Sequence, residues 1–381
     1  MKNKKILLIG GSGIISSEVC SLAIEQGYDV TILNRGRRKN KINAAAKLVI
    51  ADVKRETVEA LRTKLCEQIF DVVVDFVSYD LVVLKKILSI VKCHQYIFTS
   101  TATVYKNKEL GEAYKETDDK ENDLWKYCIN KRSCEKYLEE ECEKKFGCYY
   151  TIVRPYVTYN ETRFPYQVAP LEYYTILYRI MNELPVVVCN ENTICTVTTS
   201  KEYAIGLVGL FNNPKAYNED FHITSDNATT WKHIVEITAN KLGRELKLID
   251  IPKEYLAKYK NSEIAVDEII GDKGRNMTFD NSKIKNVVPE FLAESDFDSN
   301  VDDILSYFNN NQNNKINYLW SGSLDRLIYK YTNGNKEKCG FKYSPMSKKD
   351  KMMYMIGRYT ILYVIYNFSK KAFGAFKKLI R

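Results

Sequence analysis

Residues 4–16 read KKILLIGGSGIIS, and this stretch decides the fold. The apolar run at residues 6–9 predicts a short buried strand, and the run stops at a group of glycines. A helix-like segment begins directly after Gly13. A strand, a tight glycine turn and a helix in this order are typical of the phosphate-binding turn of a dinucleotide-binding α/β domain.

The turn itself reads GGSGIIS at residues 10–16. In the G-x-x-G-x-x-G form of this turn, Gly10 allows the bend and Gly13 lets the backbone approach a pyrophosphate, whose charge the helix N-terminus attracts. Ser16 replaces the third glycine and is small enough for the helix to pack closely on the strand. We therefore expect this turn to bind a dinucleotide through Gly10, Gly11, Ser12, Gly13, Ile14 and Ile15.

The same alternation continues outward from the turn. Helix-like segments separate the short apolar runs YDVTILN, KLVIAD, FDVVVDFV, QYIFTS and CYYTIVRP. This order predicts a Rossmann-like, doubly wound parallel sheet of the α/β class. We expect a dinucleotide-binding domain at residues 1–155 and a smaller mixed α/β substrate-binding region at 156–310, with some return to the first domain. Residues 315–381 are expected to form a basic, helical C-terminal extension.

Charge is distributed unevenly along the chain. The net charge is +9, and residues 347–381 hold nine Lys/Arg against one Asp, which leaves +1 for the rest. The nearly neutral body gives no reason to expect nucleic acid as a partner. The ten cysteines form no C-x-x-C pair, which favours free thiols in a reducing cytosol, and the three histidines share no metal-ligand spacing.

Cofactor choice is encoded after the second strand, in TILNRGRR. Asn34 and Arg35 stand where an NAD site usually has a carboxylate for the ribose 2′-hydroxyl. With Arg37 and Arg38 close behind, the segment favours NADP over NAD, because guanidinium groups suit a 2′-phosphate. After the third strand, Asp52 could hydrogen-bond the adenine edge, with Val53 beside it at the cofactor.

A tyrosine and a lysine four residues apart form the candidate catalytic pair. On a helix, Tyr127 and Lys131 share one face, so the ammonium group favours the phenolate and brings the tyrosine pKa toward working pH. Such a tyrosine can take or give the proton of a carbinol while hydride moves to or from a nicotinamide. The fifth strand ends in TSTATVY, where Thr101, with Ser100 beside it, can bond the same oxygen.

In this order the motifs resemble the extended short-chain dehydrogenase/reductase superfamily, specifically its NAD-dependent epimerase/dehydratase family and a bacterial GGxGxIS/NRG subgroup. The resemblance covers roughly residues 4–300. It implies that Tyr127 is the acid/base, that Lys131 lowers its pKa and binds ribose, and that Thr101 orients the substrate. It also places Pro155 at the cofactor and Tyr156 at the substrate. In the loop that follows, Arg163 could bind a nucleotide diphosphate or be an ordinary surface arginine. The matching segments are GGSG at 10–13, Asp52, residues 99–105, Tyr127-x-x-x-Lys131, Arg154-Pro155 and FDNSKIKNVVPEF at 279–291.

The family contains several chemistries. Ala102 and Thr103 follow Thr101 where 4,6-dehydratases carry an Asp-Glu pair, whereas the A-T-V-Y run resembles galactose-type 4-epimerases. We therefore expect an NAD(P)-dependent epimerase of a nucleotide-activated sugar, acting in polysaccharide biosynthesis through a transient keto-sugar. A 4-keto reductase uses the same residues and stays open. The chain is also similar to chloroplast stem-loop RNA-binding proteins, so a non-catalytic RNA-binding relative is a further alternative.

The C-terminal extension combines apolar and basic residues. Five basic residues fall on one arc of a helical wheel, and four apolar residues fall on the opposite arc; these are Lys370, Lys371, Lys377, Lys378 and Arg381, and Phe373, Phe376, Leu379 and Ile380. Such a helix could lie on an anionic membrane, dock to a partner protein or pack on the protein itself. We expect a cytoplasmic protein, with peripheral attachment to the inner membrane face left open, as is a homodimer.

Overall fold

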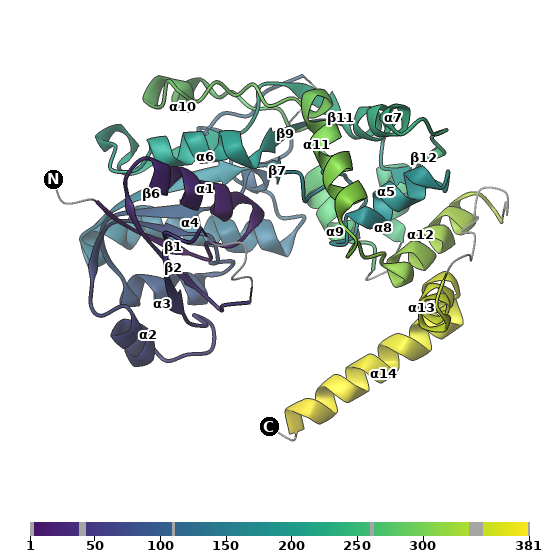
Figure 1. Cartoon of the computed structure of the whole chain (residues 1–381), viewed down its shortest axis with the longest axis horizontal. Coiled ribbons are helices and arrows are strands. Elements are labelled where there is room, and N and C mark those ends of the chain that lie inside the picture. The colour runs from purple at the N-terminus through teal and green to yellow at the C-terminus, as the bar shows by residue number, and fades with distance from the viewer. Residues whose placement is uncertain (1–3, 38–42, 109–110, 260–262, 335–345, 380–381) are drawn as a thin grey trace. The chain divides into compact units, whose positions relative to one another are not determined.

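The computed structural model describes residues 4–37, 43–108, 111–259, 263–334 and 346–379, with side chains as far as Lys370. The chain divides into two compact units that interleave in sequence (Figure 1). Unit 1 contains Met1–Pro165, Ile194–Thr229 and Arg275–Ser299, and unit 2 contains Tyr166–Thr193, Thr230–Gly274 and Asn300–Arg381.

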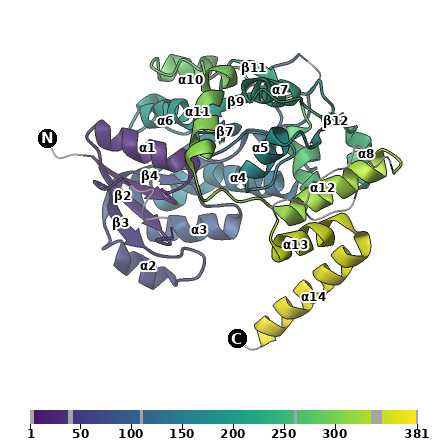
Figure 2. The ribbon, with the colours of Figure 1, turned by 45° about the vertical axis from the view of Figure 1, so that its right-hand side comes forward.

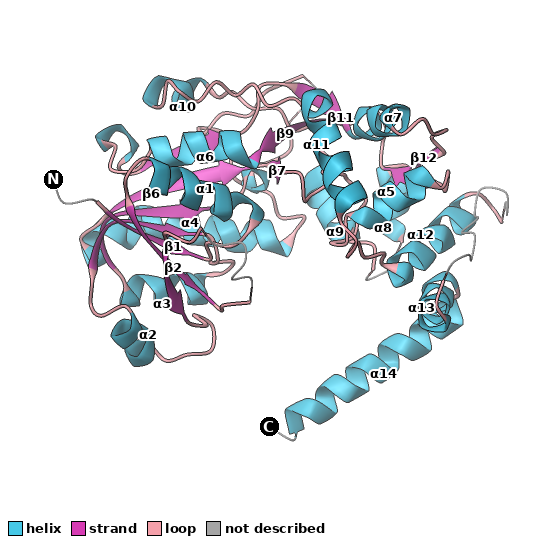
Figure 3. Cartoon of the chain, viewed as in Figure 1, coloured by secondary structure: helices cyan, strands magenta, loops and turns pink. Residues whose placement is uncertain are grey.

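Unit 1 is built on a seven-stranded sheet of order β10-β6-β5-β4-β1-β2-β3, in which the neighbouring strands run parallel (Figure 3). The predicted doubly wound α/β fold is confirmed. The strands are β1 Lys5–Ile9, β2 Asp29–Asn34, β3 Lys47–Ile50, β4 Ile69–Asp75, β5 Lys92–Thr99, β6 Tyr149–Pro155 and β10 Glu219–Ile223.

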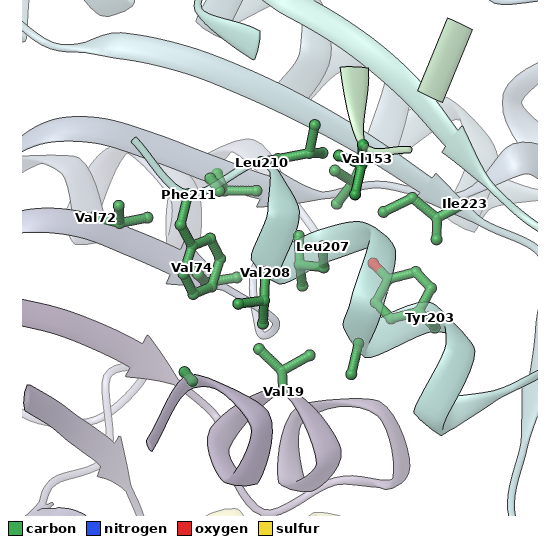
Figure 4. Close-up of a cluster of buried hydrophobic side chains, with 14 of the residues drawn as sticks. Val19, Val72, Val74, Val153, Tyr203, Leu207, Val208, Leu210, Phe211 and Ile223 are labelled. Carbon is green, nitrogen blue, oxygen red and sulfur yellow. The ribbon is translucent and has the colours of Figure 1, made fainter. Parts of the chain in front are cut away.

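Helices cover both faces of this sheet, which explains why its strands are continuously apolar. In β1, Ile6 and Leu8 enter a buried cluster with α1 and α6, whereas Leu7 and Ile9 enter a second cluster with α2, α3 and α4. Figure 4 shows the first cluster, in which Val19 of α1 lies among side chains of the strands and of α6. The helices are α1 Ile14–Glu25, α2 Val58–Lys64, α3 Leu81–Ile90, α4 Lys126–Phe146 and α6 Ser200–Gly209.

The segment DFHITSD lies within residues 156–310, for which the sequence predicts some return to the first domain. It forms β10 and pairs in parallel with β6 at the edge of the main sheet. Its apolar pattern predicts a strand correctly. The pattern does not encode the partner, which lies about 65–70 residues earlier in the chain and is reached through α6.

The remaining strands form two small sheets. One has the order β11-β9-β7 and the other pairs β12 with β8. Their bounds are β7 Val157–Tyr159, β8 Val186–Val188, β9 Ile194–Thr199, β11 Ala228–Thr230 and β12 Leu248–Asp250. The other helices are α5 Tyr174–Met181, α7 Trp231–Lys241, α8 Lys253–Lys258, α9 Val266–Glu268, α10 Ser282–Val287 and α11 Phe297–Asn310, followed by α12 Tyr318–Tyr331, α13 Lys348–Arg358 and α14 Thr360–Leu379.

The helical character predicted for the C-terminal extension is confirmed by α12, α13 and α14. Within the described ranges, no helix has the length and apolar character that crossing a bilayer requires. The cysteines of these ranges carry free thiols.

Candidate active site

The glycine turn lies where the sheet reverses its strand order, because β1 is flanked by β2 on one side and β4 on the other. Gly10 follows β1 with a φ of +95°, and a Cβ there would lie 2.4 Å from Cγ1 of Val77. Both the left-handed backbone and the lack of space therefore require glycine. This reversal point is where open α/β sheets bind their ligands.

Ser16 does more than fill the place of a third glycine. Its hydroxyl donates to the Gly10 carbonyl at 2.9 Å and accepts from the Gly13 N–H at 2.8 Å. These two bonds close the turn from inside the first turn of α1. The turn is thus held in shape by a buried side chain of the chain itself.

One cavity of about 720 Å³ in unit 1 collects the predicted site residues. Its lining contains every one of them except Gly11, which lies in the turn against the side chain of Ile32. The predicted residues in the lining are Gly10, Ser12, Gly13, Ile14, Ile15, Asn34, Arg35, Asp52, Val53, Ser100, Thr101, Tyr127, Lys131, Pro155, Tyr156 and Arg163. A cavity of this size is large enough for a cofactor or substrate site.

Asn34 at the end of β2 lines the cavity and has a buried amide nitrogen without a hydrogen-bond partner among the described residues. Asn34 is buried, its Oδ1 accepts the Gly36 N–H at 2.8 Å, and its Nδ2 has no partner within the described structure. Arg35 and Arg37 also line the cavity and are exposed, whereas Arg38 lies outside the described residues. After β3, the Asp52 carboxylate accepts the Lys54 N–H at 3.0 Å.

The candidate catalytic pair lies at the start of α4. Lys131 is buried, and its Nζ donates to the carbonyl oxygens of Ser78 at 2.8 Å and Thr99 at 2.6 Å. The same Nζ lies 5.7 Å from the centroid of the Tyr127 ring. Burial lowers the pKa of Lys131 to about 8. Its ammonium group is thus fixed between the ends of β4 and β5 and beside the tyrosine.

Thr101 and Ser100 follow β5, but their hydroxyls have different surroundings. Thr101 Oγ1 lies 2.9 Å from Thr103 Oγ1, at the wall of the cavity. The Ser100 hydroxyl donates to the buried Glu135 carboxylate, whose two oxygens also receive Nε and Nη2 of Arg154 at 2.9 and 2.8 Å. The predicted contacts of Thr101 and Ser100 with a substrate oxygen stay predictions. Because the Ser100 hydroxyl is already bonded to Glu135, Thr101 is the better placed of the two to bond that oxygen.

Beneath this wall lies a buried polar cluster that joins α4, β6 and β10. Arg154 Nη1 donates to Asp220 at 2.6 Å and to the Tyr105 hydroxyl at 2.8 Å. Burial lowers the pKa of His222 to about 3, and its Nε2 lies 2.5 Å from the Tyr105 hydroxyl. His222 is therefore neutral near neutral pH and forms part of the buried cluster that supports the site.

The sequence analysis did not identify Tyr79, which follows β4 and lines the cavity. Its ring centroid lies 5.9 Å from that of Tyr127 and 5.2 Å from Lys131 Nζ. Phe76 and Val77 line the cavity from the same loop. Its position in the sequence could have indicated Tyr79. The loop after β4 follows a strand next to the point where the sheet reverses its strand order, and such loops line the ligand crevice. Arg163, expected at the substrate, does line the cavity, and its Nη1 donates to the Thr158 carbonyl at 2.9 Å.

The fold and the cavity define a Rossmann-like protein of the extended short-chain dehydrogenase type. A comparison with protein families matches residues 6–193 to the NAD dependent epimerase/dehydratase family. The match covers about half of the chain, and together with the shared fold it supports an enzyme of the extended short-chain dehydrogenase type.

Solved structures share the fold at low sequence identity. An epimerase from Methanothermobacter thermautotrophicus is 14% identical with a TM-score of 0.66, and the match covers 81% of this chain and 92% of that chain. UDP-glucuronic acid 4-epimerase from Bacillus cereus, solved with UDP-glucuronic acid and NAD, is 16% identical with a TM-score of 0.64, covering 80% and 99%. At these identities the likeness shows the fold alone.

A curated relative is named for stem-loop binding and not for an epimerase activity. The chloroplast stem-loop binding protein of 41 kDa b from Arabidopsis thaliana is 24% identical over an alignment of 254 residues, and the match covers 63% of this chain. The chain spans 64% of the length of that relative.

Proposed function

We propose that the chain is an NAD(P)-dependent epimerase of a nucleotide-activated sugar, acting in the cytoplasm through a transient keto-sugar. The observation that carries this proposal is the single cavity lined by Tyr127, Lys131 and Thr101 together with the glycine turn. The Bacillus cereus epimerase, which was solved with both NAD and a UDP-sugar, supports the same cofactor and substrate class.

The residues around the turn fit a nicotinamide dinucleotide. Gly10 leaves no space for a side chain, and the first amides of α1 have no partner within their own helix, so the backbone offers a cradle for phosphate. Asn34, Arg35 and Arg37 line the cavity after β2, where the adenosine ribose would lie. When bound there, the nicotinamide would supply a reversible hydride acceptor.

Tyr127 would perform the proton transfer. Its phenolate would take the proton of the substrate carbinol and return it after the keto-sugar has rotated. Lys131 supports the phenolate, because an ammonium with a pKa of about 8 is largely charged at neutral pH. Thr101 would hold the reacting oxygen, and Arg163 would bind a diphosphate oxygen.

The acid inventory of the cavity argues against dehydration. Among the described residues that line it, Asp52 is the only carboxylate, and it follows β3 at the cofactor end of the sheet. The residues after Thr101, where a dehydratase has an acid pair, form a short 3₁₀ turn of Ala102–Val104. An epimerase needs one acid/base group, which the cavity provides.

Two other functions have specific support. A 4-keto reductase would use the same residues, and the donors at Asn34, Arg35 and Arg37 favour the NADP that such an enzyme often uses. The stem-loop binding named for the Arabidopsis relative favours RNA. Its weakness is the charge of residues 1–346, which is only +1.

The test is turnover of UDP-glucose and UDP-glucuronic acid that carry deuterium at the sugar C4, with catalytic NAD or NADP. An epimerase inverts the centre, keeps the deuterium and forms no net NAD(P)H, because the same hydride returns. A reductase consumes NAD(P)H in proportion to product from a 4-keto-sugar. Tyr127→Phe should lower the rate by about 10²–10⁴-fold while cofactor binding persists, and Tyr137→Phe, on the same helix outside the cavity, is the matched control. Normal turnover by the Tyr127 variant would refute the proposal.

A further inference from the structure

The last described helix, α14, presents large apolar side chains to solvent. Ile361, Val364, Ile365 and Phe368 are 75%, 59%, 60% and 76% exposed. Spacings of three and four residues place them on one face of the helix. Contiguous exposed apolar side chains of this size ordinarily mark an interaction surface.

The other face of α14 is fixed within unit 2. Tyr363 is buried, and its ring lies 4.3 Å from the guanidinium of Arg326 in α12. The preceding helix, α13, packs closely on α12, where a Cβ on Gly322 would lie 2.2 Å from the Tyr354 carbonyl oxygen. Figures 1 and 2 show α14 continuing from α13 away from α12. The packing of α12 and α13 thus holds α14 in place with its apolar face toward solvent.

The two helices α13 and α14 also carry exposed positive charge. Lys348 and Lys349 at the start of α13 and Lys370 in α14 are exposed. Lys370 follows Ile361 by about two and a half helical turns, which places it on the opposite side of the helix. Residues 347–381 carry nine Lys/Arg against one Asp in sequence, although the side chains after Lys370 lie outside the described residues.

We infer that α14 docks along the surface of an anionic membrane. Its apolar side chains would enter the acyl boundary, and the basic charge of residues 347–381 would attract the helix to anionic head groups. A second copy of the chain is a less favourable partner for this face. Its pairing would bring together two segments that each carry a charge of +8, and these segments would repel each other. None of the described helices has the length and apolar character for a span, so the contact is interfacial. The inference goes beyond the proposed reaction, because it concerns where the enzyme works.

The test is cosedimentation of the full chain with vesicles of phosphatidylglycerol and phosphatidylcholine, compared with phosphatidylcholine alone. We expect binding to the anionic vesicles only, weakened by added salt. Val364→Ser with Phe368→Ser should lower the partition coefficient on the order of a hundredfold, because two large side chains lose their burial in lipid. Lys348→Gln with Lys349→Gln should lower it on the order of tenfold.

The matched control is Leu171→Ser, which removes a side chain that is 85% exposed elsewhere in unit 2 and should leave binding unchanged. The Val364/Phe368 variant should keep the wild-type circular dichroism and sugar turnover, since both positions are exposed. Three results would overturn the inference: no binding of the wild type to anionic vesicles, equal binding by the Val364/Phe368 variant, or a lipid-free dimer that this variant converts to a monomer. The last would assign the face to a second copy.

Discussion

Replacing Arg154 by methionine should destabilise the protein by about 3–5 kcal/mol, because it leaves a buried carboxylate without its partner. Arg154 is fully buried and contacts both oxygens of Glu135, at 2.9 and 2.8 Å. Asp220 would keep compensation from Lys283 at 3.1 Å and Lys120 at 3.6 Å. Among the described residues, Arg154 is the only cation that forms an ion pair with Glu135, so the penalty arises at this carboxylate.

The assay is the free energy of unfolding from urea denaturation, followed by far-ultraviolet circular dichroism. The double variant Arg154→Met/Glu135→Gln should recover about 2 kcal/mol or more, because the neutral amide can still accept the Ser100 hydroxyl. Arg132→Met is the control, because its ion pair with Asp123 lies at the surface and contributes about 1 kcal/mol or less. A loss below about 1 kcal/mol for the single variant, or a double variant no more stable than the single one, would refute the reasoning.

Three further predictions concern the cavity. Ser16→Ala removes both hydrogen bonds that close the glycine turn and should raise the NADPH dissociation constant about tenfold in a fluorescence titration; Ser133→Ala, which removes an ordinary exposed helix bond, should not. Asn34→Asp should weaken the binding of NADPH by about tenfold or more and favour the binding of NADH in the same titration. The reason is that a carboxylate repels the 2′-phosphate and accepts a hydrogen bond from the ribose hydroxyl. An unchanged selectivity between the two cofactors would contradict the NADP preference. The folded pKa of Lys131, about 8, lies below its ordinary 10.5, so its contribution to stability should rise by about 3 kcal/mol as pH increases between these values. The stability difference between wild type and Lys131→Met, measured against pH, should show that rise, and a flat difference would count against a depressed pKa.

The strands of the first 155 residues could be predicted because each carries its own signal. Their apolar runs reflect burial on both faces, and Gly10 and Tyr127 are recognisable from local spacing. The place of β10 could not be predicted in this way. Its apolar residues are equally compatible with either sheet, and only the docking of α6 beside α1 selects the edge next to β6.

Side-chain partners were the least predictable part of the site. Ser100 and Thr101 are neighbours with similar hydroxyls, yet the Ser100 hydroxyl is engaged by Glu135, which lies 35 residues away. Similarly, Ser16 was expected only to be small, but its hydroxyl closes the turn. Such roles depend on which atoms the fold brings within hydrogen-bond distance, and periodicity carries no information about them.

The sheet order also separates Asp52 from Thr101, because these two residues follow different strands of the sheet. From β3, which precedes Asp52, to β5, which precedes Thr101, the sheet order β3-β2-β1-β4-β5 contains four steps. At about 4.8 Å per step, the two ends lie about 19 Å apart, too far for Asp52 to exchange a proton directly with a substrate oxygen that Thr101 holds. Asp52→Asn should therefore raise the KM for the cofactor, yet leave kcat within about twofold at saturating cofactor. A fall in kcat comparable to that of Tyr127→Phe would show that the cavity uses a second acid/base group, and the case against dehydration would then fail.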